Sequence, residues 1–535
     1  MAITEFLRRQ NEALIPLYKE SALTAWMSAT TGEEAWSTRR ERALHAYYRF
    51  FADEARFEQV MTYRQQATLD PLQRRQLDDL YINMVRNQLD GDLAARTVKM
   101  TQELSHLFTT FRPTLNGQAV TNNDLLKILK ESDDSHECQE AWLASKQIAK
   151  QAERDILALV AQRNAEARSL GFDNFYHMSY ATEELDLDET FALFEEVRAL
   201  TEEPYQRVKR EIDEQVAEKF SLPLDELRPW HYGDPFFQGA PPEPRVAVDE
   251  LYQNKDLEQL TADTFASMGF DITDLLAKSD LYPRENKYPF GFCTSMDREG
   301  DVRVLVNADA SQFWMTALLH EFGHAVYYKH VDRALPFLLR CHAHTLTTEG
   351  VAMFFGRLNK TPAWIDKFLC TDGEGIQGRN GGRGRASQVA AAGAHALQRE
   401  LLVGMRWFLA FVFFERELYE RPEQDLNRRW WEIVADIQQL HPPEETHYPD
   451  WAAKMHFSLA PVSYQNYILG ELTASQLQHY IETHVSDDWF TPEVGKYLRE
   501  VFFAPGARWE WQEKIIKATG EPLNAQFFGQ QVARV

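Results

Sequence analysis

A His-Glu-x-x-His pattern at residues 320–324 constrains this chain more than any other feature. Apolar residues run from Phe313 to Tyr328 on both sides of it, which predicts a buried helix. His320 and His324, four residues apart, would lie on the same face of that helix. Burying two imidazoles without a partner is costly, and one zinc ion bound by both supplies a partner. The pattern therefore predicts a metal centre, with Glu321 placed to take a proton from a water that the ion activates.

A catalytic zinc takes three protein ligands and leaves one position open, so a third ligand is needed. His330 has the spacing of the metzincin pattern, but Tyr327 stands where that pattern has a chain-turning glycine. Without the turn, the helix carries His330 about 240° around its axis, away from the ion. Pro336 then breaks the chain. A second apolar helix is expected to begin near Cys341 and to pack antiparallel on the first, which makes Glu349 the better candidate.

Glu349 is not expected on a solvated surface, because its neighbours are apolar: Leu346, Val351, Met353 and Phe354. A carboxylate there can bind the zinc, pair with a buried arginine or cap a helix. We assign the ion to His320, His324 and Glu349, a two-histidine, one-glutamate site of the gluzincin kind. His342 and His344, on the approach to Glu349, are expected to support the ligands or to pack.

Composition limits the partners and the compartment. Lys and Arg number 57 and Asp and Glu number 81, so the net charge is −24, which argues against nucleic acid and anionic membranes. No apolar run is long enough to suggest a signal peptide or a membrane span. The four cysteines (Cys138, Cys293, Cys341 and Cys370) form no C-x-x-C pair, which favours a reducing compartment. We expect a cytoplasmic protein, and the sequence leaves its oligomeric state open.

Helical spacing of apolar residues along most of the chain predicts a mainly α fold. Residues 1–110 are expected to form several amphipathic helices. One long helix is expected from the caps at residues 133–135 to Gly171, and another from Asp186. A G-x-G-x-x-G pattern at residues 373–378 follows no strand, so we do not expect it to bind a dinucleotide.

One clear strand signal precedes the zinc helix. Residues 290–295 and 302–307 alternate around a polar, Gly-containing turn, which predicts a β-hairpin. A hairpin edge beside the metal could hold an extended peptide by strand addition. A purely structural hairpin is the alternative.

A second concentration of polar residues lies near the C-terminal end: Lys454, His456, Tyr464 and Tyr467. By spacing alone the signal is weak, because a lysine, a histidine and two tyrosines are common among ordinary surface and core residues.

With these motifs in hand, the chain resembles the angiotensin-converting enzyme (peptidyl-dipeptidase A) family of zinc peptidases. The His-Glu-Phe-Gly-His core is shared with that family and with the thimet-oligopeptidase and Taq-carboxypeptidase families. Further matches favour the converting enzyme: Trp430-Trp431 leading to His441-Pro442-Pro443, Ala453-Lys454-Met455-His456, Tyr464-Gln465-Asn466-Tyr467, and Gly233-Asp234-Pro235-Phe236-Phe237-Gln238. These segments run from about residue 233 to residue 467. Outside them the likeness is one of length and helical pattern.

The resemblance implies a role for each matched residue. Lys454, Tyr464 and Gln238 would bind the free carboxylate of a peptide's C-terminus, a set of donors that suits an anion. His456 would hydrogen-bond the substrate backbone. Tyr467 would donate to the oxyanion of the tetrahedral intermediate.

Three departures from the family are expected to matter. Residues 350–353 lack the aspartate that supports a zinc histidine in the family, so another group must replace it. Residues 292–294 lack the family's histidine on the substrate-binding strand, which leaves Thr294 there with one backbone contact weakened. Asn466 stands where the family has a chloride-linked arginine, so we expect no chloride activation through that position.

The fold implied by the resemblance is a large helical ellipsoid of two halves around a deep central cleft. It would form one peptidase domain over residues 1–535, with residues 1–110 as a lid, 285–360 as the zinc-binding core and 440–470 as the substrate-binding segment. The expected activity is that of a hydrolase: a metalloprotease with one Zn²⁺ that releases C-terminal dipeptides from short peptides. A thimet-like oligopeptidase, a metallocarboxypeptidase and an inactive zinc-binding scaffold are the alternatives.

Overall fold

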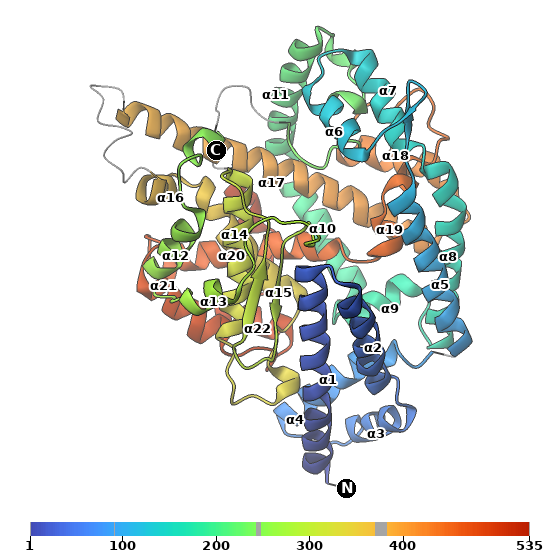
Figure 1. The fold of residues 1–535 in the computed structure, drawn as a ribbon, viewed down its shortest axis with the longest axis vertical. Coiled ribbons are helices and arrows are strands. Elements are labelled where there is room, and N and C mark those ends of the chain that lie inside the picture. The colour runs from blue at the N-terminus through green and yellow to red at the C-terminus, as the bar shows by residue number, and fades with distance from the viewer. Residues whose placement is uncertain (1, 90, 242–247, 370–381, 534–535) are drawn as a thin grey trace. The chain divides into compact units, whose positions relative to one another are not determined.

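The computed structural model describes residues 2–89, 91–241, 248–369 and 382–533. Helices form most of this part of the chain, and its strands form two sheets of two antiparallel strands each (Figure 1). The predicted mainly α fold is confirmed. None of the described helices combines the length and apolar character needed to cross a membrane. The glycine pattern at residues 373–378 lies outside the described residues.

The chain divides into two compact units, each built from separate stretches. Unit 1 comprises Met1–Gln88, Pro244–His395 and Leu469–Phe528, and unit 2 comprises Leu89–Glu243, Ala396–Ile468 and Gly529–Val535. The predicted zinc ligands therefore belong to unit 1, and the residues predicted to bind the substrate carboxylate belong to unit 2. A single peptidase domain with a lid and a central cleft stays a prediction.

Unit 1 is made of helices and one hairpin. Its elements are α1 (Ile3–Thr31), α2 (Glu34–Phe51), α3 (Glu54–Arg64), α4 (Pro71–Val85), α12 (Leu257–Ser267), α13 (Thr273–Lys278), β3 (Phe292–Ser295), β4 (Val302–Leu305), α14 (Gln312–Lys329), α15 (Thr345–Arg357), α16 (Pro362–Trp364), α21 (Pro492–Tyr497) and α22 (Trp511–Thr519). Helices α17 (Gly382–Glu420), α20 (Gln465–His484) and α23 (Gln526–Ala533) run from one unit into the other along the chain.

The N-terminal helices of unit 1 share a hydrophobic core with the segment that leads into α15. The core is formed by Phe6, Leu7, Leu14, Phe50, Phe51, Val60, Leu77, Leu80, Met84, Phe337 and Leu338. Asn11 on α1 also accepts a hydrogen bond from the Leu338 backbone N–H, at 2.9 Å. Burying this apolar surface holds the connection between α14 and α15 on α1 and α4.

The hairpin predicted before the zinc helix is present, with shorter strands than expected. β3 pairs antiparallel with β4, from Phe292 opposite Leu305 to Ser295 opposite Val302. The turn between them is closed by the Met296 N–H, which donates to the Asp301 carbonyl at 2.7 Å. Both strands contact α14, so the hairpin lies against the helix that carries the predicted zinc motif.

Unit 2 is helical apart from a short hairpin. Its elements are α5 (Gly91–Thr110), β1 (Thr114–Leu115), β2 (Gln118–Ala119), α6 (Asn122–Glu131), α7 (Ser135–Lys146), α8 (Ala149–Ser169), α9 (Phe175–Thr182), α10 (Leu187–Leu200), α11 (Glu202–Phe220), α18 (Leu426–Ile437) and α19 (His456–Leu459). Asp186 caps α10 as predicted, accepting a hydrogen bond from the Glu189 N–H at 2.9 Å.

The prediction of a single long helix between residues 133 and 171 was wrong. Asp134 caps its start as predicted, but the chain forms two helices, α7 and α8, that break at Gln147 and Ile148. The Gln147 side chain hydrogen-bonds both the backbone N–H and the carbonyl of Thr114 on β1, each at 2.8 Å. The break therefore coincides with a tertiary contact, and no glycine or proline marks it in the sequence.

Glu415 on α17 is a buried carboxyl that makes stability depend on pH. Its side chain is fully buried, and one oxygen accepts a hydrogen bond from the Val462 N–H at 2.9 Å. Burial raises the pKa of Glu415 to about 8. Because the unfolded chain releases this proton near pH 4.5 and the folded chain near pH 8, folding stability is lost as the pH rises between these values.

Glu415→Gln keeps the shape and the acceptor but cannot ionise. We expect the unfolding free energy of the wild type, relative to this variant, to fall by on the order of 3 kcal/mol between pH 5.5 and pH 8. Urea denaturation of both proteins across this range measures the difference, in which titrations common to the two proteins cancel. A difference that is independent of pH would contradict the raised pKa.

Candidate metal centre and substrate-binding residues

Helix α14 carries the first two predicted ligands. It begins after Ser311, whose hydroxyl accepts from the Trp314 N–H at 3.4 Å, and its central residues are buried. It ends at Lys329 and is capped by His330, whose Nδ1 donates to the Val326 carbonyl at 2.8 Å. His330 therefore completes the C-terminal turn of the helix, which agrees with its exclusion as a ligand.

Helix α15 begins later than the sequence indicated. It was expected near Cys341, but it starts at Thr345, where His344 is the cap and its Nδ1 accepts from the Leu346 N–H at 3.0 Å. A short turn at Phe337–Leu339 occupies the preceding residues. His344 thus has a structural role, as expected, and Glu349 lies in the second turn of the helix.

Helices α14 and α15 lie side by side (Figure 1). Tyr327 and Thr347 approach through their hydroxyls at 3.4 Å, while Gly323, four residues earlier on α14, faces Ala352, five residues later on α15. Residue numbers rise along one helix as they fall along the other. The predicted antiparallel packing is therefore found, and it brings the start of α15 against the C-terminal half of α14.

The three predicted ligands come together at this contact. Nε2 of His320 lies 3.7 Å from one Glu349 carboxylate oxygen, and Nε2 of His324 lies 3.8 Å from the other. The candidate ligand atoms of the three residues all lie within 4.8 Å of one another. Separations of 3.7–3.8 Å are too long for hydrogen bonds. Ligands about 2.0–2.1 Å from a tetrahedral zinc are about 3.4 Å apart, so these residues fit the ion with small adjustments.

The charges and exposure of the site also fit a divalent cation. Burial raises the pKa of Glu349 to about 7, and burial together with the Glu349 charge raises that of Glu321 to about 8. Burial lowers the pKa of His320 to about 4 and lowers that of His324 well below its usual value. Neutral imidazoles beside two carboxyls form a donor set that a dication would stabilise. The His320 side chain is 28% exposed and that of Glu349 21%, so the site is reachable from solvent.

A threonine supports one of the candidate zinc histidines, in place of the aspartate that the family has and this sequence lacks. Oγ1 of Thr348 lies 2.7 Å from Nδ1 of His324, on the ring nitrogen that faces away from Glu349. This contact fixes the ring and leaves Nε2 for a metal. His342 is engaged with the Tyr328 hydroxyl at 3.0 Å, which agrees with a supporting role. Thr348 was missed in the sequence, although it directly precedes the predicted ligand Glu349.

The side chain of Glu321, the predicted catalytic base, extends from α14 toward the residue that precedes the hairpin. A methyl group built on Gly291, directly before β3, would lie 3.3 Å from Oε1 of Glu321. Thr294 is on β3, whose strand partner among the described residues is β4, so its other edge has no strand neighbour. On that strand, the Ser295 carbonyl accepts from the Tyr18 hydroxyl of α1 at 2.8 Å. Strand addition at the remaining edge stays a prediction.

Five predicted site residues, Lys454, Gln238, His456, Tyr464 and Tyr467, form one cluster in unit 2, whereas Thr294 lies on β3 of unit 1. Nζ of Lys454 donates to Oε1 of Gln238, although 216 residues separate the two. The ring of Tyr464 lies 5.4 Å from that of His456 and 5.3 Å from that of Tyr467, and Nζ of Lys454 lies 5.9 Å from the Tyr464 ring. The structure thus brings all five predicted residues together, a grouping that their spacing did not indicate.

Burial shapes the chemistry of this cluster. It lowers the pKa of Lys454 to about 8, while the Asp234 charge acts in the opposite direction. Burial, followed by the Lys454 charge, lowers the pKa of His456 to about 4. Asp234 was not predicted as a site residue, yet its carboxylate accepts from the Gln238 N–H at 2.9 Å and orients that loop. An aspartate before a proline, as in this segment, is a turn signal that could have found it.

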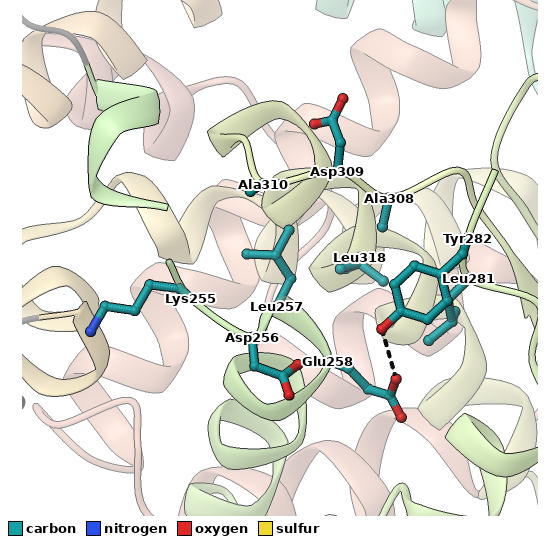
Figure 2. Close-up of a pocket in the computed structure, with 10 residues that line it drawn as sticks. All are labelled: Lys255, Asp256, Leu257, Glu258, Leu281, Tyr282, Ala308, Asp309, Ala310 and Leu318. Carbon is teal, nitrogen blue, oxygen red and sulfur yellow. Dashed lines mark hydrogen bonds between the residues drawn. The ribbon is translucent and has the colours of Figure 1, made fainter. Parts of the chain in front are cut away.

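A separate hollow of about 270 Å³ lies elsewhere in unit 1 (Figure 2). Its lining comes from the start of α12, residues 281–282, the loop 308–310 and Leu318 of α14. Inside it, the Tyr282 hydroxyl donates to the Glu258 carboxylate at 3.1 Å. The predicted site residues are not part of its lining, although Leu318 is two residues from His320.

Comparison with known proteins bears on the N-terminal part of the chain. Residues 1–232 match the family model described as angiotensin-converting enzyme (Peptidase_M2). The resemblance to the angiotensin-converting enzyme family is confirmed. The matched part ends directly before the segment at residues 233–238, where the quoted motifs begin, so match and motifs cover adjoining parts. No curated protein matches the chain. The prediction of a protease is supported by the match to this peptidase family.

Proposed function

We propose that this chain is a zinc-dependent peptidyl-dipeptidase, which hydrolyses short peptides and releases dipeptides from their C-termini. The observation that carries the proposal is the convergence of His320, His324 and Glu349, with Glu321 close enough to feel the Glu349 charge. When bound there, zinc would supply a Lewis acid that polarises the scissile carbonyl and acidifies the attacking water.

The chain's own side chains would carry the remaining steps. Glu321 would take the proton of the attacking water and pass it to the departing amine. Tyr467 would donate its hydroxyl to the developing oxyanion, and His456 would hydrogen-bond the substrate backbone. The strand that carries Thr294 would hold the extended peptide. These roles come from the family resemblance and are supported by the clustering of Tyr467 and His456 around Tyr464.

The dipeptidase mode depends on the cluster around Lys454. Lys454, Gln238 and Tyr464 would bind the terminal carboxylate with one cation and two neutral donors. Lys454 donates to Gln238 and faces the rings of Trp407 and Tyr464. A buried lysine with a lowered pKa gains from an anionic partner, which a free C-terminus provides.

The setting and partners belong to the same proposal. Short peptides are the expected partners, and the net charge of −24 disfavours nucleic acid and anionic membranes. A cytoplasmic location is supported by the three described cysteines, Cys138, Cys293 and Cys341, which are all free thiols.

Substrate amidation tests the proposal directly. With N-blocked short peptides, we expect C-terminal amidation to lower kcat/KM by about 10–100-fold, because a charge-assisted contact is lost. Mass spectrometry of the products should find dipeptides released from the free acids. Cleavage unaffected by amidation would indicate a thimet-like oligopeptidase, release of single residues a metallocarboxypeptidase, and no cleavage of any peptide an inactive zinc-binding scaffold.

Lys454→Met is the matched variant for the same experiment. It should lower kcat/KM for the free-acid peptide by a similar factor. It should have little further effect on the amidated peptide, because amidation and the Lys454→Met substitution remove the same interaction. Lys150→Met, which changes another lysine of unit 2 outside this cluster, is the control. Equal losses on both substrates for Lys454→Met would contradict a carboxylate contact.

A further inference from the structure

Helix α20 contributes none of the three candidate metal ligands, yet it contacts α15 at Glu349. A methyl group built on Gly470 of α20 would lie 3.0 Å from Cβ of Glu349 and 3.0 Å from Sδ of Met353. Such separations are well inside ordinary van der Waals contact, which begins near 3.5 Å. The absence of a side chain at residue 470 is therefore what lets Glu349 occupy its place.

A second glycine faces the same helix from the other side of the contact. A methyl group built on Gly350 would lie 2.5 Å from Cγ2 and 2.6 Å from Cβ of Thr473, and 3.2 Å from the Gly470 carbonyl oxygen. Both helices thus present a glycine where they meet, and their backbones approach more closely than side chains would allow. Gly350 directly follows Glu349, so this close approach lies next to the proposed ligand.

A buried ion pair joins the same two helices two turns further along α15. The Arg357 guanidinium of α15 pairs with the Glu471 carboxylate of α20, and their side chains are 7% and 15% exposed. Nη1 of Arg357 also donates to Oγ of Ser475 at 3.3 Å. Buried, charge-assisted contacts of this kind fix geometry between elements. The pair prevents α15 from sliding or tilting away from the glycine contact.

We propose that α20 positions Glu349 for metal binding, with Gly470 as the positioning residue and the Arg357–Glu471 pair as its second anchor. The inference rests on the proposed zinc site. The Cβ atom of Glu349 is fixed by the backbone, so it cannot rotate away from an added methyl group, whereas the Met353 side chain can. Relief would require α15 or α20 to move by some tenths of an ångström, and metal–ligand distances tolerate only about 0.2 Å.

The test is the zinc affinity of Gly470→Ala, measured by competition with a chromogenic chelator. We expect zinc binding at least about 10-fold weaker than in the wild type, as for other residues that orient metal ligands. Thermal unfolding of the zinc-free protein should be little changed, because the higher helix propensity of alanine offsets the cost of the small helix shift. Gly404→Ala is the matched control, since a methyl group there would meet only the Phe408 ring, at 3.9 Å.

Two further variants separate the possible causes. In Gly470→Ala/Met353→Ala the methionine is gone, and zinc binding should stay weak if displacement of Glu349 is the cause. Recovery of wild-type affinity would overturn the proposal. If Gly470→Ala does not fold, Glu471→Gln replaces it, with weaker zinc binding expected and unchanged affinity overturning the proposal.

Glu349→Ala, measured in the same assay, distinguishes failure of this inference from failure of the proposed site. Wild-type zinc affinity in Glu349→Ala would mean that Glu349 is no ligand, and the proposed site would fall. Weak binding in Glu349→Ala together with wild-type affinity and a lower unfolding temperature in Gly470→Ala would leave the site in place. In that case the glycine only stabilises the fold, and the positioning role is overturned.

Discussion

Replacing Glu321 by glutamine is expected to lower kcat for peptide hydrolysis by about 10²–10⁴-fold, the usual contribution of a general base, while zinc stays bound. Glutamine keeps the shape of the side chain beside Gly291 but cannot accept a proton from the attacking water. Because Glu321 is not one of the three candidate ligands, metal content should equal that of the wild type.

The measurement combines steady-state kinetics with elemental analysis of the same samples. Glu54→Gln, at the exposed start of α3, is the control for a glutamate-to-glutamine change in unit 1 and should retain full activity. Turnover by Glu321→Gln comparable with that of the wild type would exclude this residue as the base. Loss of zinc together with activity would instead make Glu321 part of the metal site.

Removing one of the two histidine ligands should lower the zinc affinity by a factor similar to the loss of kcat in Glu321→Gln. His324→Ala deletes one of three ligands. Zinc sites have about 10–16 kcal/mol of binding free energy, so if each ligand contributes a third of it, losing one lowers the affinity on the order of 10³-fold. Peptide hydrolysis should fall to background at micromolar zinc. Chelator competition and kinetics at increasing zinc measure the two effects.

His330→Ala is the matched control for this prediction. His330 is on the same helix, but its ring donates to the Val326 carbonyl at the helix end and lies outside the candidate ligand group. Its loss should weaken the last turn of α14 and leave zinc affinity close to that of the wild type. Equal loss of zinc in both variants would contradict the assignment of ligands.

The three candidate metal ligands could be proposed from the sequence because each depends on local rules. Helical periodicity places His320 and His324 on one face, and the apolar residues around Glu349 leave its carboxylate few roles. The hairpin before α14 also follows from alternation and a glycine-containing turn. These features are set by residues close together in the sequence, and the structure has all of them.

Contacts between distant segments account for what could not be predicted. The break between α7 and α8 coincides with the contact of Gln147 with Thr114, and α15 starts late because His344 acts as its cap. Lys454 and Gln238 meet across 216 residues, so only the family resemblance grouped them. Thr348 supports His324 because α14 and α15 pack antiparallel in one register, which composition and spacing do not specify.

The central claim is that side chains of α14 and α15 hold one zinc ion, and anomalous diffraction at the zinc absorption edge tests it most directly. The account predicts one anomalous peak, about 2.0–2.2 Å from Nε2 of His320, Nε2 of His324 and a Glu349 carboxylate oxygen. A zinc peak elsewhere in the protein, or one bound by the two histidines with Glu349 beyond bonding distance, would contradict it.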